Sequence, residues 1–156
     1  MEKRIAVFPG SFDPITKGHE HIILRATQLF DEVVVAMGVN TNKKYLFSTE
    51  KRLEWLTKTF EGVDGVSVAS YEGLTVDFCE KIGARFMLRG LRNSKDFEYE
   101  QTIAQMSRGL NPKIETILMC TDPEFGAINA LVVREIIKNK GDVSAFVPDR
   151  INVYED

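Results

Sequence analysis

The hydrophobic positions of the chain follow two alternating spacings. Short continuous runs rich in Val, Ile and Phe predict buried strands over residues 4–8, 32–38, 66–71, 86–88 and 115–119. Between these runs, apolar residues recur every three or four positions, which predicts amphipathic helices over residues 22–30, 53–60, 76–82, 97–106 and 132–137. Ser48 and Ser94 are the expected N-caps of the second and fourth helices, and Gly141 is the expected C′ residue after the fifth.

Regular alternation of strands and helices indicates parallel βαβ units. We therefore predict an α/β fold, a doubly wound Rossmann-like domain with a five-stranded parallel sheet. The chain has 156 residues, which suits one domain spanning 1–156. We find no internal repeat, no low-complexity segment and no linker rich in Gly, Ser or Pro.

Composition narrows the possible partners and location. A formal net charge of −3 argues against nucleic-acid binding, and the first apolar run, Ile5 to Phe8, is too short for a signal peptide or a membrane span. Cys79 and Cys120 lie 41 positions apart in apolar surroundings, with no CxxC motif. We expect both to be reduced and largely buried, and the protein to be cytoplasmic, without a membrane partner.

In open parallel sheets, ligands bind beyond the carboxyl ends of the strands. Several bases follow the predicted strands, and an acidic protein that gathers bases at one edge is expected to bind an anion there; they are His19, Lys43, Lys44, Arg89 and Arg92. The chain contains neither GxGxxG nor GxxxxGK[ST], so the usual dinucleotide fingerprint and the Walker motif are absent.

The segment Thr16-Lys17-Gly18-His19 opens the first predicted helix. There His19 meets the free N–H groups and the dipole that favour phosphate, and its imidazole can donate to an oxygen that gains charge in a transition state. A solvated role is the alternative for a His at a helix start. His21 cannot share an ion with His19, because positions i and i+2 point in different directions on a helix, and a zinc site is not expected.

The remaining charges have functional and structural interpretations. Lys43 and Lys44 in a polar loop are solvated by default, whereas Arg89 and Arg92 directly follow a short strand, where their forked guanidinium groups suit phosphate oxygens. The acidic residues of the fourth helix are interpreted as its solvent-exposed face, and Tyr99 as a residue that either packs in the core or faces a ligand. These acidic residues are Asp96, Glu98 and Glu100.

Three stretches together resemble one enzyme family. PGSFDPITKGH, at residues 9–19, resembles the PGTFDPxTxGH start of bacterial phosphopantetheine adenylyltransferases, in which T-x-G-H is the form taken by the HxGH motif of nucleotidyltransferases. RGLR followed by DFEYE, and VREI followed by GDVSAFVP, are similar to later family segments. The resemblance extends from Lys3 to about Pro148.

The resemblance implies transfer of an adenylyl group from ATP to 4′-phosphopantetheine, which gives dephospho-coenzyme A and pyrophosphate. It implies Mg²⁺ as cofactor and a homohexamer. His19 takes the role of transition-state stabiliser. The positions that match phosphopantetheine-binding residues are Ser11, Lys43, Thr75 and Arg89. The positions that match ATP-binding residues are Ser11, Phe12, His19, Gly90, Leu91, Arg92, Glu100, Phe125, Gly126, Ala127, Ile128, Asn129, Ala130 and Leu131.

The chain departs from this family pattern where the last predicted helix begins. Ile128-Asn129-Ala130-Leu131 stands where the family usually has Ile followed by two or three Ser or Thr residues, and Ser11 replaces a commoner Thr. The missing hydroxyl groups leave backbone N–H groups and the Asn129 side chain to meet a triphosphate. The alternatives are therefore a nucleotidyltransferase for another phosphate substrate and a nucleotide-binding module with weakened catalysis.

Overall fold

Five strands form one parallel sheet in the computed structural model, which describes residues 1–155. The strands are β1 (Ile5–Gly10), β2 (Glu32–Gly38), β3 (Val66–Tyr71), β4 (Phe86–Leu91) and β5 (Glu115–Cys120). Their order across the sheet is β3-β2-β1-β4-β5, so the chain builds outward from β1 in one direction and then in the other. The predicted fold class is confirmed, and each apolar run became a strand.

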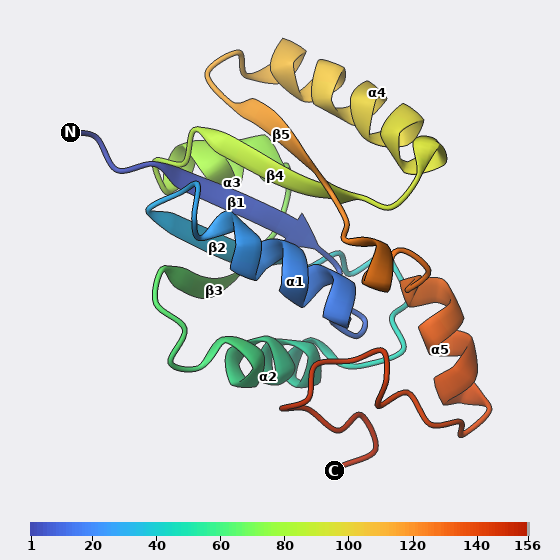
Figure 1. Cartoon of the computed structure of the whole chain (residues 1–156). Coiled ribbons are helices and arrows are strands. Elements are labelled where there is room, and N and C mark those ends of the chain that lie inside the picture. Colours follow the sequence, from blue (N-terminus) through green and yellow to red (C-terminus); the bar gives the residue numbers. More distant parts are fainter. Residues whose placement is uncertain (156) are drawn as a thin grey trace.

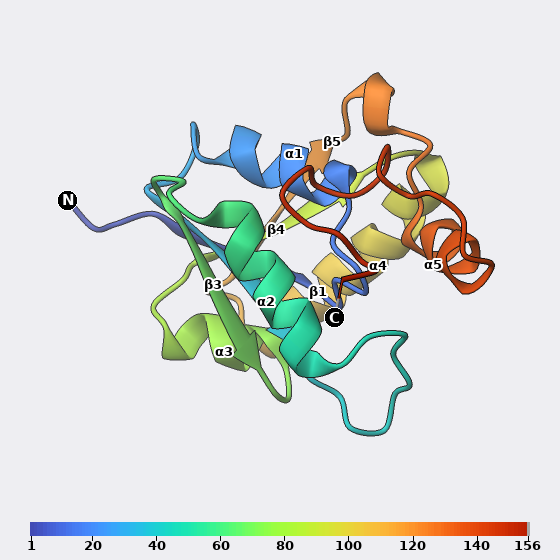
Figure 2. The ribbon, with the colours of Figure 1, turned by 90° about the horizontal axis from the view of Figure 1, so that it is seen from below.

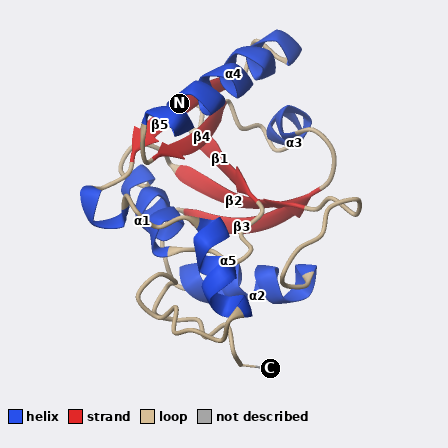
Figure 3. Cartoon of the chain, turned by 90° about the vertical axis from the view of Figure 1, so that its right-hand side faces the viewer, coloured by secondary structure: helices blue, strands red, loops and turns tan. Residues whose placement is uncertain are grey.

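Helices cover both faces of the sheet (Figures 1 and 3). They are α1 (Lys17–Ala26), α2 (Thr49–Phe60), α3 (Thr75–Lys81), α4 (Ser94–Leu110) and α5 (Ala130–Lys138), with a short 3₁₀ turn, η1 (Pro123–Phe125), before α5. In Figure 3, α1, α2 and α5 lie on one side of the sheet, and α3 and α4 lie on the other. No helix within residues 1–155 is both long and apolar enough to cross a membrane.

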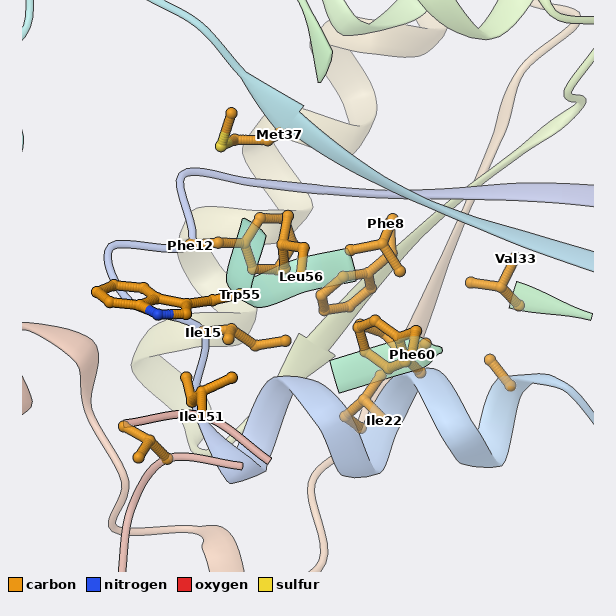
Figure 4. Close-up of a cluster of buried hydrophobic side chains, with 14 of the residues drawn as sticks. Phe8, Phe12, Ile15, Ile22, Val33, Met37, Trp55, Leu56, Phe60 and Ile151 are labelled. Atoms are coloured by element: carbon orange, nitrogen blue, oxygen red, sulfur yellow. The ribbon is translucent and has the colours of Figure 1, made fainter. Parts of the chain in front are cut away.

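The main core lies between the sheet and the layer formed by α1, α2 and α5 (Figure 4). Side chains of a strand alternate between faces, so Phe8 of β1 points into this core while Val7 joins a smaller cluster under α3. Phe12 and Ile15, from the loop after β1, also pack in the main core with Trp55 of α2. The loop that leaves the central strand is therefore anchored by its own apolar side chains.

Helix α4 packs differently from the others. Its apolar residues Tyr99, Met106 and Leu110 are 67%, 68% and 62% exposed, and its one buried residue is a charged one, Glu100. Glu100 is expected on the solvent-exposed face of this helix, and that interpretation is wrong. Its carboxylate is buried because it pairs with Arg89 of β4.

Three other local expectations are corrected. The N-cap of α4 is Asn93, whose side chain accepts from Asp96 N–H, rather than Ser94. At the end of α5 the left-handed residue is Lys140, and Gly141 is the next one along; a Cβ on Gly141 would lie 2.6 Å from Ile136. Cys120, expected to be buried, is exposed at the end of an edge strand. Ser48 caps α2 as predicted.

The sheet opens between β1 and β4. β1 pairs with β2 over six positions, from Ile5 to Gly10, but with β4 only at Ala6 and Val7. The strands separate toward their carboxyl ends, at the point where the strand order changes side. In doubly wound sheets this crevice is where ligands bind.

Candidate active site

Two cavities lie side by side at the carboxyl ends of the strands. The smaller, of about 440 Å³, extends over α1 and the start of α5; the larger, of about 890 Å³, lies between α3 and α4. They share a floor, defined here as Pro9, Gly10, Ser11, Lys43, Tyr45 and Arg89, which borders both. Two ligands in these cavities would therefore meet over Ser11, Lys43 and Arg89.

The smaller cavity brings together every base that the sequence placed after a strand. They come from α1, from the loop between β2 and α2, and from the end of β4, and Arg134 of α5 joins them; the set is His19, Lys43, Lys44, Arg89, Arg92 and Arg134. The loop with the two lysines, residues 39–48, projects from the body of the molecule in Figure 2. The predicted convergence of cations at one edge is confirmed, and such a concentration of positive charge suits a polyanion.

His19 is held in one tautomer at the start of α1. Thr16 N–H donates to His19 Nδ1 (3.0 Å), and Thr16 Oγ1 accepts from His19 N–H (3.3 Å), so the two residues cap the helix reciprocally. Because Nδ1 is an acceptor, the proton of the neutral ring is on Nε2. The Phe12 ring packs edge-on against the imidazole at 5.3 Å and fixes its plane.

The electrostatic surroundings keep His19 neutral. Burial, followed by the charges of Arg89 and Arg92, lowers its pKa to about 4. At neutral pH the ring is thus an uncharged donor through Nε2. A neutral imidazole with its proton on Nε2 can stabilise a developing oxyanion by donating a hydrogen bond to it.

Two arginines at the end of β4 are paired with carboxylates of α4. Arg89 forms a two-pronged pair with buried Glu100, with its Nη2 2.8 Å from Oε1 and its Nε 3.0 Å from Oε2, and it also donates to Pro9 O across the open seam of the sheet. Arg92 donates to Asp96 through its backbone N–H (2.9 Å) and its side chain. Each guanidinium is therefore oriented before any ligand arrives.

The larger cavity has a different chemistry. Its walls include the apolar flank of α4, with Tyr99, Ile103 and Leu110, and the start of α3, where Thr75 Oγ1 lies 2.7 Å from Tyr71 Oη. Tyr99 therefore faces the cavity rather than the core. A ligand with both polar and apolar groups suits this mixture, with an anionic end at the shared floor.

The predicted site residues fall into two groups. Those that border one or both cavities are Ser11, Phe12, His19, Lys43, Thr75, Arg89, Gly90, Arg92, Glu100, Ile128, Asn129, Ala130 and Leu131. Those that border neither are Leu91, Phe125, Gly126 and Ala127. Phe125 instead packs on His21 at 4.8 Å, and His21 lies 3.7 Å from Asp122, which gives His21 a structural place beside η1.

Asn129 is the N-cap of α5, as its position before the apolar stripe predicts. Its Oδ1 accepts from Leu131 N–H at 2.8 Å. The Oδ1 atom of the side chain that was expected to replace a serine hydroxyl is therefore used by its own helix, together with one of the first-turn N–H groups, and its Nδ2 is the atom that can donate to a phosphate. Leu131 borders the cavity and is 58% exposed.

Sequence reasoning missed several residues of this region. Tyr45 borders both cavities, and Arg134 reaches back to donate to Asp13 O (3.3 Å). Asp13 is 5% exposed, and its carboxylate accepts from Leu46 N–H (2.7 Å) and Phe47 N–H (2.9 Å). The FDP segment after β1 was a signal for Asp13, since an acidic residue between two apolar anchors needs partners.

The carboxylates that border the smaller cavity are already engaged. Asp13, Asp96 and Glu100 border the smaller cavity, and each has protein donors at its oxygens. Within residues 1–155 no three His, Cys, Asp or Glu side chains cluster closely enough to hold a metal ion. A divalent cation at this site would therefore rely on ligand oxygens.

Comparison with known proteins agrees with this geometry. Residues 7–144 match the cytidylyltransferase-like family model. The phosphopantetheine adenylyltransferase of Flavobacterium psychrophilum is 52% identical over 96% of this chain and 99% of that protein, and the enzyme of the same name from Lacticaseibacillus casei is 48% identical over 95% and 89%. A bifunctional NMN adenylyltransferase/ADP ribose pyrophosphatase structure from Francisella tularensis shares the fold, with a TM-score of 0.73 at 20% identity over 96% of this chain and 46% of that one.

Proposed function

The chain belongs to the phosphopantetheine adenylyltransferase family, and from this premise we propose that it transfers the adenylyl group of ATP to 4′-phosphopantetheine. The products are dephospho-coenzyme A and pyrophosphate, in the penultimate step of coenzyme A synthesis. The observation that carries this assignment is the pair of cavities with a common cationic floor, since a reaction between two phosphates needs them side by side.

ATP occupies the smaller cavity in this proposal, and phosphopantetheine occupies the larger. An oxygen of the phosphopantetheine phosphate attacks the α-phosphorus of ATP, and the bond from that phosphorus to the oxygen bridging to the β-phosphate breaks, so that pyrophosphate leaves. A phosphate monoester is already an anionic nucleophile at neutral pH, so no general base is required. The chain contributes position and charge: Lys43 and Arg89 hold the reacting phosphates over Ser11.

His19 stabilises the transition state in this scheme. Its Nε2–H donates to a non-bridging oxygen of the α-phosphoryl group as negative charge develops there. Support comes from the Thr16 hydrogen bond that fixes the tautomer and from the low pKa of about 4 that keeps the ring neutral. Arg92, held by Asp96, supplies positive charge on the same side.

We further propose Mg²⁺ as cofactor. The engaged carboxylates support binding through triphosphate oxygens and water rather than through protein ligands, as Mg²⁺ commonly does in nucleotide sites. When bound, the ion neutralises part of the triphosphate charge.

A homohexamer is also part of the proposal. The exposed apolar residues Phe97 of α4 and Val132 of α5, which border neither cavity, support burial against another copy of the chain. The whole chain, 1–156, would act as one nucleotidyltransferase domain. Two unpaired cysteines, Cys79 and Cys120, support a reducing location such as the cytoplasm. Light scattering that shows a stable monomer at working concentration would refute the hexamer.

The decisive experiment is a pyrophosphate-release assay with ATP and 4′-phosphopantetheine. Nicotinate mononucleotide and glycerol phosphate serve as control acceptors. Release only with phosphopantetheine supports the proposal, and release with another acceptor favours a different transferase. Binding of ATP without any release would favour the weakened binding module, for which the departure at Ala130 and Leu131 is the specific observation.

A further inference from the structure

A buried arginine lies directly behind the shared floor. Arg52, in the first turns of α2, is 1% exposed and is the largest fully buried side chain of the described residues. Within residues 1–155 it has no carboxylate within 4.0 Å. Burying a charge without a counter-charge is costly unless hydrogen bonds replace its water. Its partners therefore indicate what the residue does.

The Arg52 guanidinium bonds to two loops at once. Nη1 donates to Ser11 O (2.8 Å) in the loop after β1, and Nε donates to Phe47 O (3.2 Å) in the loop after β2. Nη2 reaches Thr49 Oγ1 (3.4 Å), and the Arg52 Cζ lies 3.8 Å from the centre of the Tyr45 ring. Two of these partners, Ser11 and Tyr45, are part of the floor.

The bond to Ser11 O sets the direction of one peptide plane. In a trans peptide the C=O and the following N–H point in opposite directions. With Ser11 O turned inward to Arg52, the Phe12 N–H points away from Arg52. No acceptor for this N–H lies among residues 1–155. Phe12 borders the smaller cavity while its ring packs in the core, so its main chain is the part that faces the cavity.

The conformation of Phe12 needs such support. Its φ is +48°, in the left-handed region that non-glycine residues rarely adopt. That backbone persists only where the surroundings determine it. The Phe12 ring is held by Phe8 and His19, and the preceding carbonyl is held by Arg52.

We propose that Arg52 is a positioning residue for nucleotide binding: it holds the Ser11–Phe12 peptide so that the Phe12 N–H donates to a phosphate oxygen of ATP. The identity of the nucleotide rests on the proposed function. Asp13 fixes the same loop as Arg52, because both bond to the main chain of Phe47. Phe47 donates its N–H to the Asp13 carboxylate, and its C=O accepts from Arg52. The buried positive charge adds to the attraction at the floor.

The test compares Arg52→Lys with Arg150→Lys. Lysine keeps the charge at position 52 but cannot hold Ser11 O and Phe47 O in the same fork. Arg150 also donates to a main-chain carbonyl near α2, Glu61 O at 2.6 Å, but borders neither cavity, so it is the matched control. Both folded variants are assayed for the two substrate KM values, and the Phe12 amide is followed by ¹H–¹⁵N NMR on addition of α,β-methylene-ATP.

We expect the wild-type Phe12 amide to move downfield when the analogue binds. In Arg52→Lys this shift should fall to less than about half, and the KM for ATP should rise about tenfold or more, the effect of losing a hydrogen bond to a charged group. The KM for phosphopantetheine should stay within about threefold, because Phe12 borders only the nucleotide cavity. Arg150→Lys should leave all three measurements unchanged.

Three results would overturn the proposal. One is a wild-type Phe12 amide that does not respond to the analogue, which needs no variant to fold. Another is a folded Arg52→Lys with wild-type shift and KM for ATP but a lower melting temperature, which would make the role purely structural. The third is an equal rise in both KM values. A wild-type protein that shows the Phe12 shift without adenylyl transfer would instead refute the proposed function and leave Arg52 in its positioning role.

Discussion

Helices α1 and α4 both supply residues to the site, yet they are held in opposite ways. α1 buries Ile22, Ile23 and Ala26 against the sheet and presents His19 from its first turn. α4 buries a single residue, Glu100, and exposes most of its apolar side chains. The α1 part of the site is thus built on core packing, whereas the α4 part, which borders both cavities, is held to the sheet largely by the Arg89–Glu100 and Arg92–Asp96 pairs.

The difference indicates where the site is rigid and where it can adapt. Stabilising a transition state requires donors fixed before reaction, and a packed helix provides this. Binding a flexible acceptor requires an apolar contact surface rather than donors in fixed positions, and the exposed flank of α4 offers such a surface. Each of the following predictions tests one side of this contrast.

The largest effect is expected on stability, in a matched pair of truncations. Ile23→Ala on α1 should lower the free energy of unfolding by about 2–5 kcal/mol, since the side chain is fully buried. Met106→Ala on α4 should change it by less than about 0.5 kcal/mol. Urea denaturation of both variants measures the difference. Comparable losses would show that α4 is packed as firmly as α1, as burial of its face in an oligomer would make it.

His19→Ala should reduce kcat by about 10²–10³-fold, by analogy with loss of one oxyanion donor, while ATP still binds. Steady-state kinetics together with calorimetric ATP titration checks both parts. His21→Ala, on the same helix but outside both cavities, is the control. Near-normal turnover in the His19 variant would remove the residue from the mechanism.

Arg89→Ala should raise the KM for phosphopantetheine by about tenfold or more, since a charged hydrogen-bond donor is lost at the floor. The KM for ATP should change far less. Glu100→Gln reports on the pairing itself: it leaves Arg89 in place but weakens its orientation, and the phosphopantetheine KM should move in the same direction by a smaller factor. Equal changes for both substrates would contradict the division between the cavities.

Acid should destabilise the free protein through His19. The folded pKa of about 4 lies below the ordinary value of 6.5, so the unfolded chain binds more protons between these values, and stability falls as pH decreases through this window. Between pH 7 and pH 5.5 the loss should be about 1 kcal/mol, and it should be absent in His19→Gln. Urea midpoints at the two pH values measure it. An NMR titration of the ring with a pKa near 6.5 would refute the premise.

The smallest effect is expected at the start of α5. Replacing Asn129 and Ala130 by Ser should lower the KM for ATP by a few-fold and leave kcat within a few-fold, because uniform binding affects KM first. The gain is limited because Asn129 already caps the helix through Leu131 N–H. Adenylyl transfer that appears only in the double variant would mean that the natural segment disables catalysis.

Much of the fold could be predicted because parallel strands buried on both faces leave continuous apolar runs, as in Glu32–Gly38. The gathering of His19, Lys43 and Arg92 also followed, since the carboxyl ends of parallel strands meet at one edge of a sheet. The exposure of Cys120 at the end of the edge strand β5 could not be predicted, because an apolar run does not show whether a helix covers the strand.

What could not be predicted are the pairings between elements distant in sequence. A charged residue in an amphipathic helix is predicted to be exposed. The sequence around Glu100 or Arg52 does not distinguish either residue from a solvent-exposed neighbour, yet both are buried. Their burial depends on Arg89 and Ser11, which the chain brings near only after the sheet has formed. The same holds for the contact of Asp13 with the β2–α2 loop.

The shared floor also limits how tightly each cavity can hold its own substrate. The product of the proposed reaction joins the adenylyl part of ATP covalently to phosphopantetheine, so it loses translational and rotational freedom only once while keeping contacts in both cavities, other than those of the pyrophosphate that leaves. The protein therefore binds the product more tightly than either half alone. Each gain in affinity for the adenylyl part of ATP or for phosphopantetheine slows dissociation of the product. A synthetic compound that links an adenylate to a pantetheine-like arm would gain from the same effective concentration, and Ser11 marks the point at which the linker should cross.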